Sequence, residues 1–285
     1  MGSTGHAVGS VAATWDIARP VRLDPVGGVR MAGFRSLSTG LIEQQVVPHS
    51  SVTVILEFGD CSLVVEDATG RRQRGSLAAG LALRAVGMRG QSIACLEVRL
   101  SPVVAHAVLG GCPTDLDPMV DLDALWGRET SRIREQLNEA TSWGDRFTAA
   151  NTFLTRRLTA GPPMDPEVAW VWERIAVSRG RVRVDDLAVE LGWSRKRLWT
   201  RFRSQVGVPP KRATKLVRFH HAAHHLAAGR RAALVAAECG YVDQSHLHRD
   251  VLAFSGTTPV ALAGNPGLTA SHLAFEDSPS AQPPT

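Results

Sequence analysis

Between residues 21 and 100 the hydrophobic positions fall in short runs, and several of these runs alternate with polar positions. Runs of about four to eight residues bounded by turn residues are typical of β-strands. We expect strands at Thr53–Phe58, Cys61–Val65, Leu81–Val86 and Ile93–Leu100, with turns at Gly59-Asp60, Gly70 and Gly87–Gly90. Several short strands at this spacing predict a small antiparallel barrel or sandwich.

After the last of these runs the hydrophobic period becomes that of helices. Ile133, Leu137 and Ala140 recur on one helical face. Gly161-Pro162-Pro163 interrupts the helical pattern, and Asp165-Pro166 predicts a new helix with an acidic N-cap and a proline in its first turn. The sequence therefore predicts an α+β protein in which a β-rich part is followed by helices.

The helical part contains an internal repeat, with copies at residues 184–210 and 233–259. In each copy an alanine stands four residues before a glycine, and an aromatic residue follows that glycine. A second glycine and a proline stand nine and twelve residues after a leucine. The copies are Ala188, Gly192, Trp193, Leu198, Gly207 and Pro210, and Ala236, Gly240, Tyr241, Leu247, Gly256 and Pro259. Because glycine accepts the left-handed conformation of a tight turn and alanine allows close helix contact, we expect two helix-turn-helix units, at 184–206 and 232–254.

The second helix of each unit has an apolar stripe and a polar face. The stripes, expected to pack inward, are Leu198, Phe202 and Val206, and Leu247, Val251 and Phe254. The polar faces are Arg195, Lys196, Trp199, Thr200 and Arg203, and Gln244, Ser245, His248 and Arg249. Such side chains can donate hydrogen bonds to base edges or phosphates in a major groove. One such helix pair can be merely structural, but two copies with donor-rich faces favour DNA binding.

Charge changes the picture because it is unevenly distributed. Residues 1–160 carry 16 arginines and 16 acidic residues, whereas residues 181–231 carry 13 lysines and arginines against 3 acidic residues. The net charge of +5 therefore arises from the segment that contains the first unit and its continuation. A localised positive patch is expected to face phosphates.

The second copy resembles the signature of the AraC/XylS family of transcription regulators. The resemblance rests on Gly240-Tyr241-Val242-Asp243-Gln244-Ser245-His246-Leu247-His248-Arg249 and on Gly256-Thr257-Thr258-Pro259. The first copy is similar to the first unit of that family, and residues 209–228 correspond to its long connecting helix. Trp199 and Val251 depart from the family pattern, which usually has a polar residue and a phenylalanine there. The resemblance covers about 80 residues.

This resemblance implies a sequence-specific regulator, commonly an activator, whose two recognition helices enter successive major grooves of double-stranded DNA. The predicted base contacts are Arg195, Lys196, Trp199, Thr200, Gln244, Ser245, His248 and Arg249. The predicted phosphate contacts are Arg203, Lys211, Arg212, Lys215 and Arg218, which would position the protein without reading sequence. RNA polymerase is the further partner implied.

The N-terminal half resembles the sensory domains of actinobacterial members of the same family, through Val98–Pro102, Leu109–Gly111 and Val120–Leu122. That resemblance implies a cupin-like barrel followed by helices, with a small-molecule effector and a homodimer as partners to test. We therefore expect a flexible N-terminus (1–19), a sensory and dimerisation domain (20–160), a DNA-binding domain (165–264) and a disordered tail rich in Pro, Ser and Ala (265–285).

Other chemistry finds little support in the sequence. The strand region offers only His49 as a metal-binding histidine, and no phosphate loop, nucleophile elbow or Cys-x-x-Cys motif occurs. His220, His221, His224 and His225 form two pairs with the spacing of metal ligands on a helix, but no nearby Glu or Cys completes a site. We expect these histidines on solvated and DNA-proximal faces. The sequence thus predicts no enzyme, no cofactor and no metal.

Four scattered cysteines, the absence of a long apolar run and the lack of a signal-peptide pattern at Met1–Ser10 predict a cytoplasmic protein without membrane contact. Two other interpretations stay open. In one, the chain is a small-molecule-binding or cupin-like module with a nonspecific basic segment that binds nucleic acid. In the other, the N-terminal half binds no small molecule and serves only as a protein-interaction surface.

Overall fold

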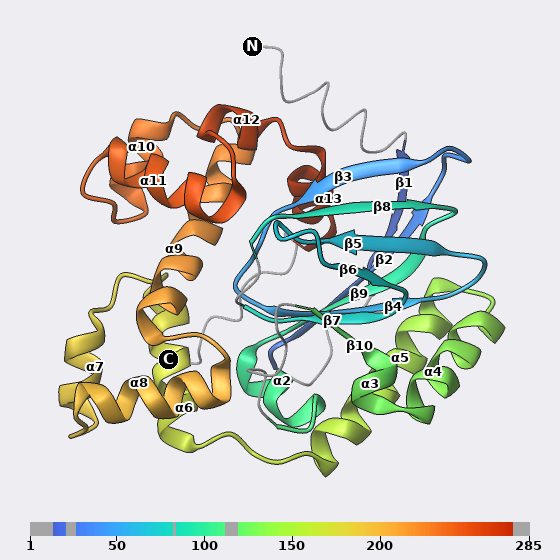
Figure 1. The fold of residues 1–285 in the computed structure, drawn as a ribbon, viewed down its shortest axis with the longest axis horizontal. Helices are drawn as coiled ribbons and strands as arrows, with labels where there is room; N and C mark the ends of the chain where they lie inside the picture. Colours follow the sequence, from blue (N-terminus) through green and yellow to red (C-terminus); the bar gives the residue numbers. More distant parts are fainter. Residues whose placement is uncertain (1–13, 21–26, 82–83, 112–118, 276–285) are drawn as a thin grey trace.

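A computed structural model describes residues 14–20, 27–81, 84–111 and 119–275 (Figure 1). The strands described form two antiparallel sheets that face each other. The larger sheet has the order β1 (Trp15–Ala18), β2 (Val29–Ser36), β9 (Ala94–Leu100), β4 (Val52–Glu57), β7 (Leu77–Ala79) and β10 (Met119–Asp121). The smaller sheet has the order β3 (Ile42–Val46), β8 (Val86–Gln91), β5 (Ser62–Glu66) and β6 (Arg72–Arg74).

Apolar side chains from the facing surfaces of the sheets form one core. Phe34, Leu63, Leu77 and Ile93 belong to it and are all buried. The two sheets are not closed into a continuous barrel, because they are separate in the hydrogen-bonding pattern. The prediction of an α+β fold with a β-rich N-terminal part is confirmed, whereas the predicted barrel is instead a pair of open, facing sheets.

The sequence placed one strand and one turn wrongly. It predicted a strand at Leu81–Val86 and a turn at Gly87–Gly90, whereas the structure has β8 at Val86–Gln91. Glycine is required inside this strand for packing. A Cβ on Gly90 would lie 2.2 Å from the carbonyl oxygen of Ser62 on neighbouring β5, so glycine marks a close approach of two strands here.

Helices follow the sheets, as expected. They are α2 (Pro102–Val108), α3 (Leu122–Trp126), α4 (Arg128–Glu139) and α5 (Trp143–Ala160). Ile133 and Leu137 of the predicted apolar face are fully buried on α4, whereas Ala140 is half-buried at the C-cap, just beyond the helix. In Figure 1, α3, α4 and α5 lie together at one end of the sheets, away from the later helices.

The remaining helices form the C-terminal part. They are α6 (Pro166–Val177), α7 (Val184–Glu190), α8 (Arg195–Val206), α9 (Pro210–Ala227), α10 (Ala232–Glu238), α11 (Gln244–Ser255) and α12 (Pro259–Ala263). The long helix α9 connects the pair α7–α8 at one end to the pair α10–α11 at the other (Figure 1). One apolar cluster runs from the larger sheet through α2 into these helices, so both halves share a continuous core.

Both ends of the described chain are more ordered than the sequence predicted. Trp15–Ala18, expected in a flexible N-terminus, pair with β2 as strand β1. The expected disordered tail begins with helix α13 (Pro266–Phe275). Its composition concealed an apolar side: Leu268, Ala270 and Ala274 are buried against the rest of the molecule. Residues 1–13 and 276–285 of these two segments lie outside the described residues.

None of the helices in the described ranges combines the length and the apolar character that crossing a bilayer requires.

Candidate DNA-binding interface

The two repeat copies fold into two helix-turn-helix units with the same local geometry. Gly192 and Gly240 end the first helices with positive φ of 63° and 74°. In each unit the amide after the glycine donates 2.9 Å back to the carbonyl of the buried alanine, from Trp193 to Ala188 and from Tyr241 to Ala236. The repeated alanine, glycine and aromatic residue therefore specify the same turn twice.

The second helix of each unit is capped in a parallel way. The Ser194 hydroxyl accepts a 3.2 Å bond from the amide of Arg197, and the Asp243 carboxylate accepts a 2.6 Å bond from the amide of His246. Such side-chain caps satisfy amides that have no partner within the helix. Both second helices, α8 and α11, thus begin at a defined residue and project their first turns in a fixed direction.

The exposure of α8 and α11 follows the predicted division into two faces. All six stripe residues are buried, from Leu198 at 0% to Phe254 at 3% exposure. All eight predicted base contacts are exposed, namely Arg195, Lys196, Trp199, Thr200, Gln244, Ser245, His248 and Arg249. Donor-bearing side chains on both helices are therefore accessible without any rearrangement.

On α8 the exposed face combines cations with a large aromatic ring. The indole of Trp199 is 45% exposed, and the guanidinium of Arg203 lies 5.0 Å from the centre of its ring. Arg195 forms a 2.9 Å ion pair with Asp185, although its side chain remains mostly exposed. Trp199 thus provides an aromatic surface that contacts a cation, at a position where the AraC/XylS pattern usually has a polar residue.

On α11 the exposed side chains are held by contacts along the helix. The side-chain nitrogens of Gln244 and His248 lie 3.3 Å apart, and Arg249 Nε donates to the carbonyl of Ser245 at 3.4 Å. These contacts are weak and exposed, so they can be exchanged for contacts to a ligand.

The predicted phosphate contacts do not share one environment. Arg203 and Lys211 are exposed. Arg212 is half-buried, its guanidinium lies 5.3 Å from the ring of Phe254, and burial followed by the nearby charge of Arg84 lowers its pKa. Lys215 and Arg218 point toward Asp250, as described next.

Asp250 is a residue that sequence reasoning missed. It is buried on α11, and its carboxylate forms ion pairs with two cations of α9. The nitrogen–oxygen distances are 3.2 Å to Lys215 and 3.6 Å to Arg218. Burial and the charge of Asp250 raise the pKa of neighbouring Tyr241. The available signal was that α11 contains a single acidic residue, three positions after Leu247 of the buried stripe. Asp250 joins the second unit to the connecting helix.

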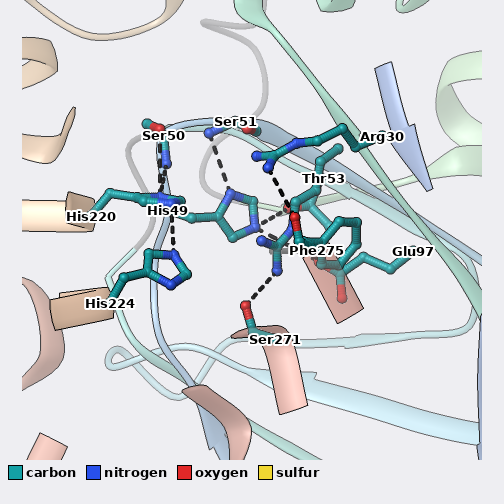
Figure 2. A network of polar contacts seen from close by, with 11 residues as sticks. Arg30, His49, Ser50, Ser51, Thr53, Glu97, His220, His224, Ser271 and Phe275 are labelled. Carbon is teal, nitrogen blue, oxygen red and sulfur yellow. Dashed lines mark hydrogen bonds and ion pairs between the residues drawn. The ribbon is translucent and has the colours of Figure 1, made fainter. Parts of the chain in front are cut away.

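One histidine of α9 differs from the expectation of a solvated face, because His220 faces the β-rich half of the chain (Figure 2). Its Nδ1 accepts a 3.1 Å bond from the amide of Ser50, and its Nε2 lies 2.8 Å from Nε2 of His224. His49, in the same loop as Ser50, has its ring 6.2 Å from that of His220. We call His49, His220 and His224 the histidine junction. No group of three or more side chains suited to a metal occurs in the part of the chain that the structure describes.

Comparison with known proteins supports the assignment of the C-terminal part. Residues 187–264 match the model of the helix-turn-helix domain family. No curated protein matches the chain at a significant level. The described helices α8 to α12 lie within the matched segment, so this part of the chain is a helix-turn-helix domain, a class of domain that binds DNA.

Among solved structures, ToxT from Vibrio cholerae has a TM-score of 0.48 at 11% identity, over 84% of this chain and 99% of that one. ToxT from the same organism with bound unsaturated fatty acid has a TM-score of 0.45 at 11% identity, over 85% and 97%. The AraC-like transcriptional activator CuxR has a TM-score of 0.26 at 14% identity, over 70% and 85%.

Proposed function

We propose that the chain is a transcription regulator of the AraC/XylS type that reads double-stranded DNA with α8 and α11 in successive major grooves. The observation that carries the proposal is the duplicated unit whose apolar stripe is buried and whose donor-bearing face is exposed in both copies. A structural helix pair would have no reason to expose a row of hydrogen-bond donors on the corresponding face in both copies. The resemblance of the signature residues further favours an activator that works with RNA polymerase in the cytoplasm.

The β-rich half is proposed to sense a small molecule. A cavity of about 120 Å³ lies between the two sheets and is lined mainly by apolar side chains, among them Phe34, Ile55 and Met119. An apolar lining with a few polar groups is typical of ligand sites, and the volume of this cavity lies below their usual range. The actinobacterial type of sensory domain and a homodimer remain part of this proposal.

To test whether α11 recognises a DNA sequence, a binding site is first selected from random duplex DNA. Affinity for that site is then measured by gel shift at about 150 mM salt, where nonspecific binding is weak. Replacing Arg249 by Ala should weaken binding to the selected site by about 1–3 kcal/mol, because one bidentate base contact is lost. Arg132→Ala is the matched control, since it also removes one positive charge, but from an exposed position on α4. Equal affinities of Arg249→Ala and wild type would contradict the proposed orientation of the second unit.

Phosphate contacts give a different signature. Lys211→Ala should weaken binding to all duplexes by a similar factor and reduce the slope of log affinity against log salt by about one. Lys211 is suited to this test because its side chain is exposed, unlike that of Arg218. If the wild-type chain selects no site and loses duplex affinity at this salt concentration, the alternative of a small-molecule-binding module with a nonspecific basic segment replaces the proposal.

A further inference from the structure

Helix α13 fills one end of the space between the two sheets. Ala270, Ala274 and Phe275 are buried in the same apolar cluster as Trp15 and Phe34. The helix also lies against the backbone of β3, because a Cβ on Gly267 would be 2.3 Å from the carbonyl oxygen of Gln45. The last described segment of the chain is thus part of the core of the first half.

The same helix forms part of the wall of the cavity between the sheets. Gly267, Ala270 and Ser271 line it beside side chains from both sheets. Its volume of about 120 Å³ is small, since ligand sites usually measure about 300–1,000 Å³. A molecule the size of an ordinary metabolite needs more room than this cavity offers, and movement of α13 would enlarge it.

A buried guanidinium lies where α13 meets the cavity, since Arg99 and Ser271 both line it. Figure 2 shows Ser271 and Phe275 of α13 beside Arg30 and Glu97 of the larger sheet. The Arg99 side chain is 2% exposed, donates to Ser271 Oγ at 2.8 Å and to Glu97 Oε1 at 2.7 Å, and lies 3.7 Å from the centre of the Phe275 ring. Arg30 donates to the carbonyl oxygen of Phe275 at 3.5 Å. Helix α13 thus presents an aromatic ring and two oxygen acceptors to two guanidinium groups.

We propose that the cavity and the seat of α13 form one ligand site, and that α13 is its resident occupant when no ligand is bound. The ligand is an aromatic molecule that carries an oxygen acceptor, because a ring and acceptor oxygens are what α13 offers to Arg99 and Arg30. An anionic acceptor is favoured, since Glu97 is the carboxylate paired with Arg99 while two guanidinium groups face the site. The inference deepens the proposed function and rests on the sensory role of this cavity.

Displacement of α13 would directly affect contacts of the second helix-turn-helix unit. Only Gly264 and Asn265 separate α12 from α13. Gln45 of β3 donates to the carbonyl of Ser255 at the end of α11, at 3.4 Å, and accepts a bond from Asn265 at 3.5 Å. One side chain of the smaller sheet therefore contacts both the recognition helix and the start of α13, so a ligand that displaces α13 also loosens the contact with α11.

The first experiment uses the full chain and anilinonaphthalene sulfonate, an anionic aromatic dye that fluoresces in apolar sites. The Phe275→Ala variant should bind the dye at one saturable site, at least about tenfold more tightly than wild type. Val260→Ala is the matched control, because it also removes apolar atoms but from a residue on α12 that is 84% exposed. The control should bind the dye as wild type does, and equal affinities of Phe275→Ala and wild type would overturn the proposal.

The second experiment tests whether the α13 segment itself occupies the proposed ligand site. A peptide of residues 264–275 should displace the dye from the Phe275→Ala chain, whereas the same peptide with Phe275→Ala should not. Adding Arg99→Gln to the Phe275→Ala chain should weaken dye binding at least about fivefold, by removing the partner of the sulfonate. Failure of the wild-type peptide to displace the dye would also overturn the proposal.

Circular dichroism establishes that each variant is folded. If Phe275→Ala does not fold, Phe275→Leu decides the question, because it keeps most of the apolar volume and removes the ring; unchanged dye affinity then overturns the proposal. No DNA is present in these assays. A chain that fails to select a duplex would refute the proposed regulator without altering the dye result.

Discussion

At the scale of single residues, the interface depends on which charges are compensated inside the protein and which are left for DNA. Asp250 compensates Lys215 and Arg218, whereas Arg203 and Lys211 remain exposed. From sequence, all four cations were assigned to phosphates in the same way. Pairing with a buried acid on another helix depends on tertiary packing, which local pattern does not reveal.

Asp250→Asn should lower the free energy of unfolding by about 1–3 kcal/mol, because it removes the charge from a buried acceptor of two cations. The lower end is more realistic since Lys215 is 41% exposed and water already screens that pair. Urea unfolding measures the change. Asp186→Asn, an exposed acid on α7, is the control and should stay within about 0.5 kcal/mol of wild type. A variant Asp250→Asn as stable as wild type would show that the pair is energetically neutral.

By contrast, the buried stripes and exposed faces of α8 and α11 were predictable residue by residue. The helical period assigns Leu198 to the core and Trp199 to the surface from spacing alone. The repeated glycine and alanine added the turn, because each has a local conformational cause. What spacing could not show is the stacking of Arg203 on Trp199, which depends on side-chain rotamers.

At the scale of elements, helices were predicted closely and strands less well. The predicted units begin at the first residues of α7 and α10, and they end within one residue of the last residues of α8 and α11. Strand β8 was missed because its two glycines suggested a turn, and α13 was missed because small residues concealed its buried side. Strand identity depends on pairing with distant partners, which a single sequence does not display.

The glycines of β8 allow a direct test of this explanation. Gly90→Ala should reduce stability by about 1–3 kcal/mol, since its Cβ would overlap the backbone of Ser62 and force the strands apart. Gly87→Ala in the same strand is the control, because the nearest atom, the Glu66 carbonyl oxygen, is 3.9 Å away. Thermal unfolding of the two variants should differ clearly; equal melting temperatures would mean that the sheet adjusts without penalty.

At the scale of the whole molecule, the histidine junction connects the β-rich half to α9. The Nδ1 atoms of His49 and His220 each accept a backbone amide, from Ser51 at 3.3 Å and Ser50 at 3.1 Å. Both rings therefore carry their proton on Nε2, and a second proton would have to replace a hydrogen bond. Burial lowers the pKa of both histidines, and the charges of Arg99 and His224 lower them further.

Because the folded pKa values lie below the unfolded value of about 6.5, the unfolded chain binds more protons as pH falls. The free energy of unfolding is therefore highest above the unfolded pKa, where both histidines are neutral in either state. Below that pH it decreases by up to about 1.4 kcal/mol per pH unit for each histidine. Melting temperature should therefore fall between about pH 7 and pH 5, and the fall should be shallower in His220→Gln. His248→Gln, an exposed residue on α11, should retain the wild-type dependence. A wild-type profile in His220→Gln would contradict this account of the junction.

The position of α13 has a practical consequence for anyone who builds hybrid regulators from this chain. A fusion at Gly161–Asp165 looks like a clean exchange of modules, but the last helix of the donor would arrive without Arg99, Gln45 and the facing sheets that hold it. Its apolar side would then be left in water and would favour aggregation. A functional hybrid should instead transplant residues 266–275 together with the first module, as two discontinuous pieces of a single unit.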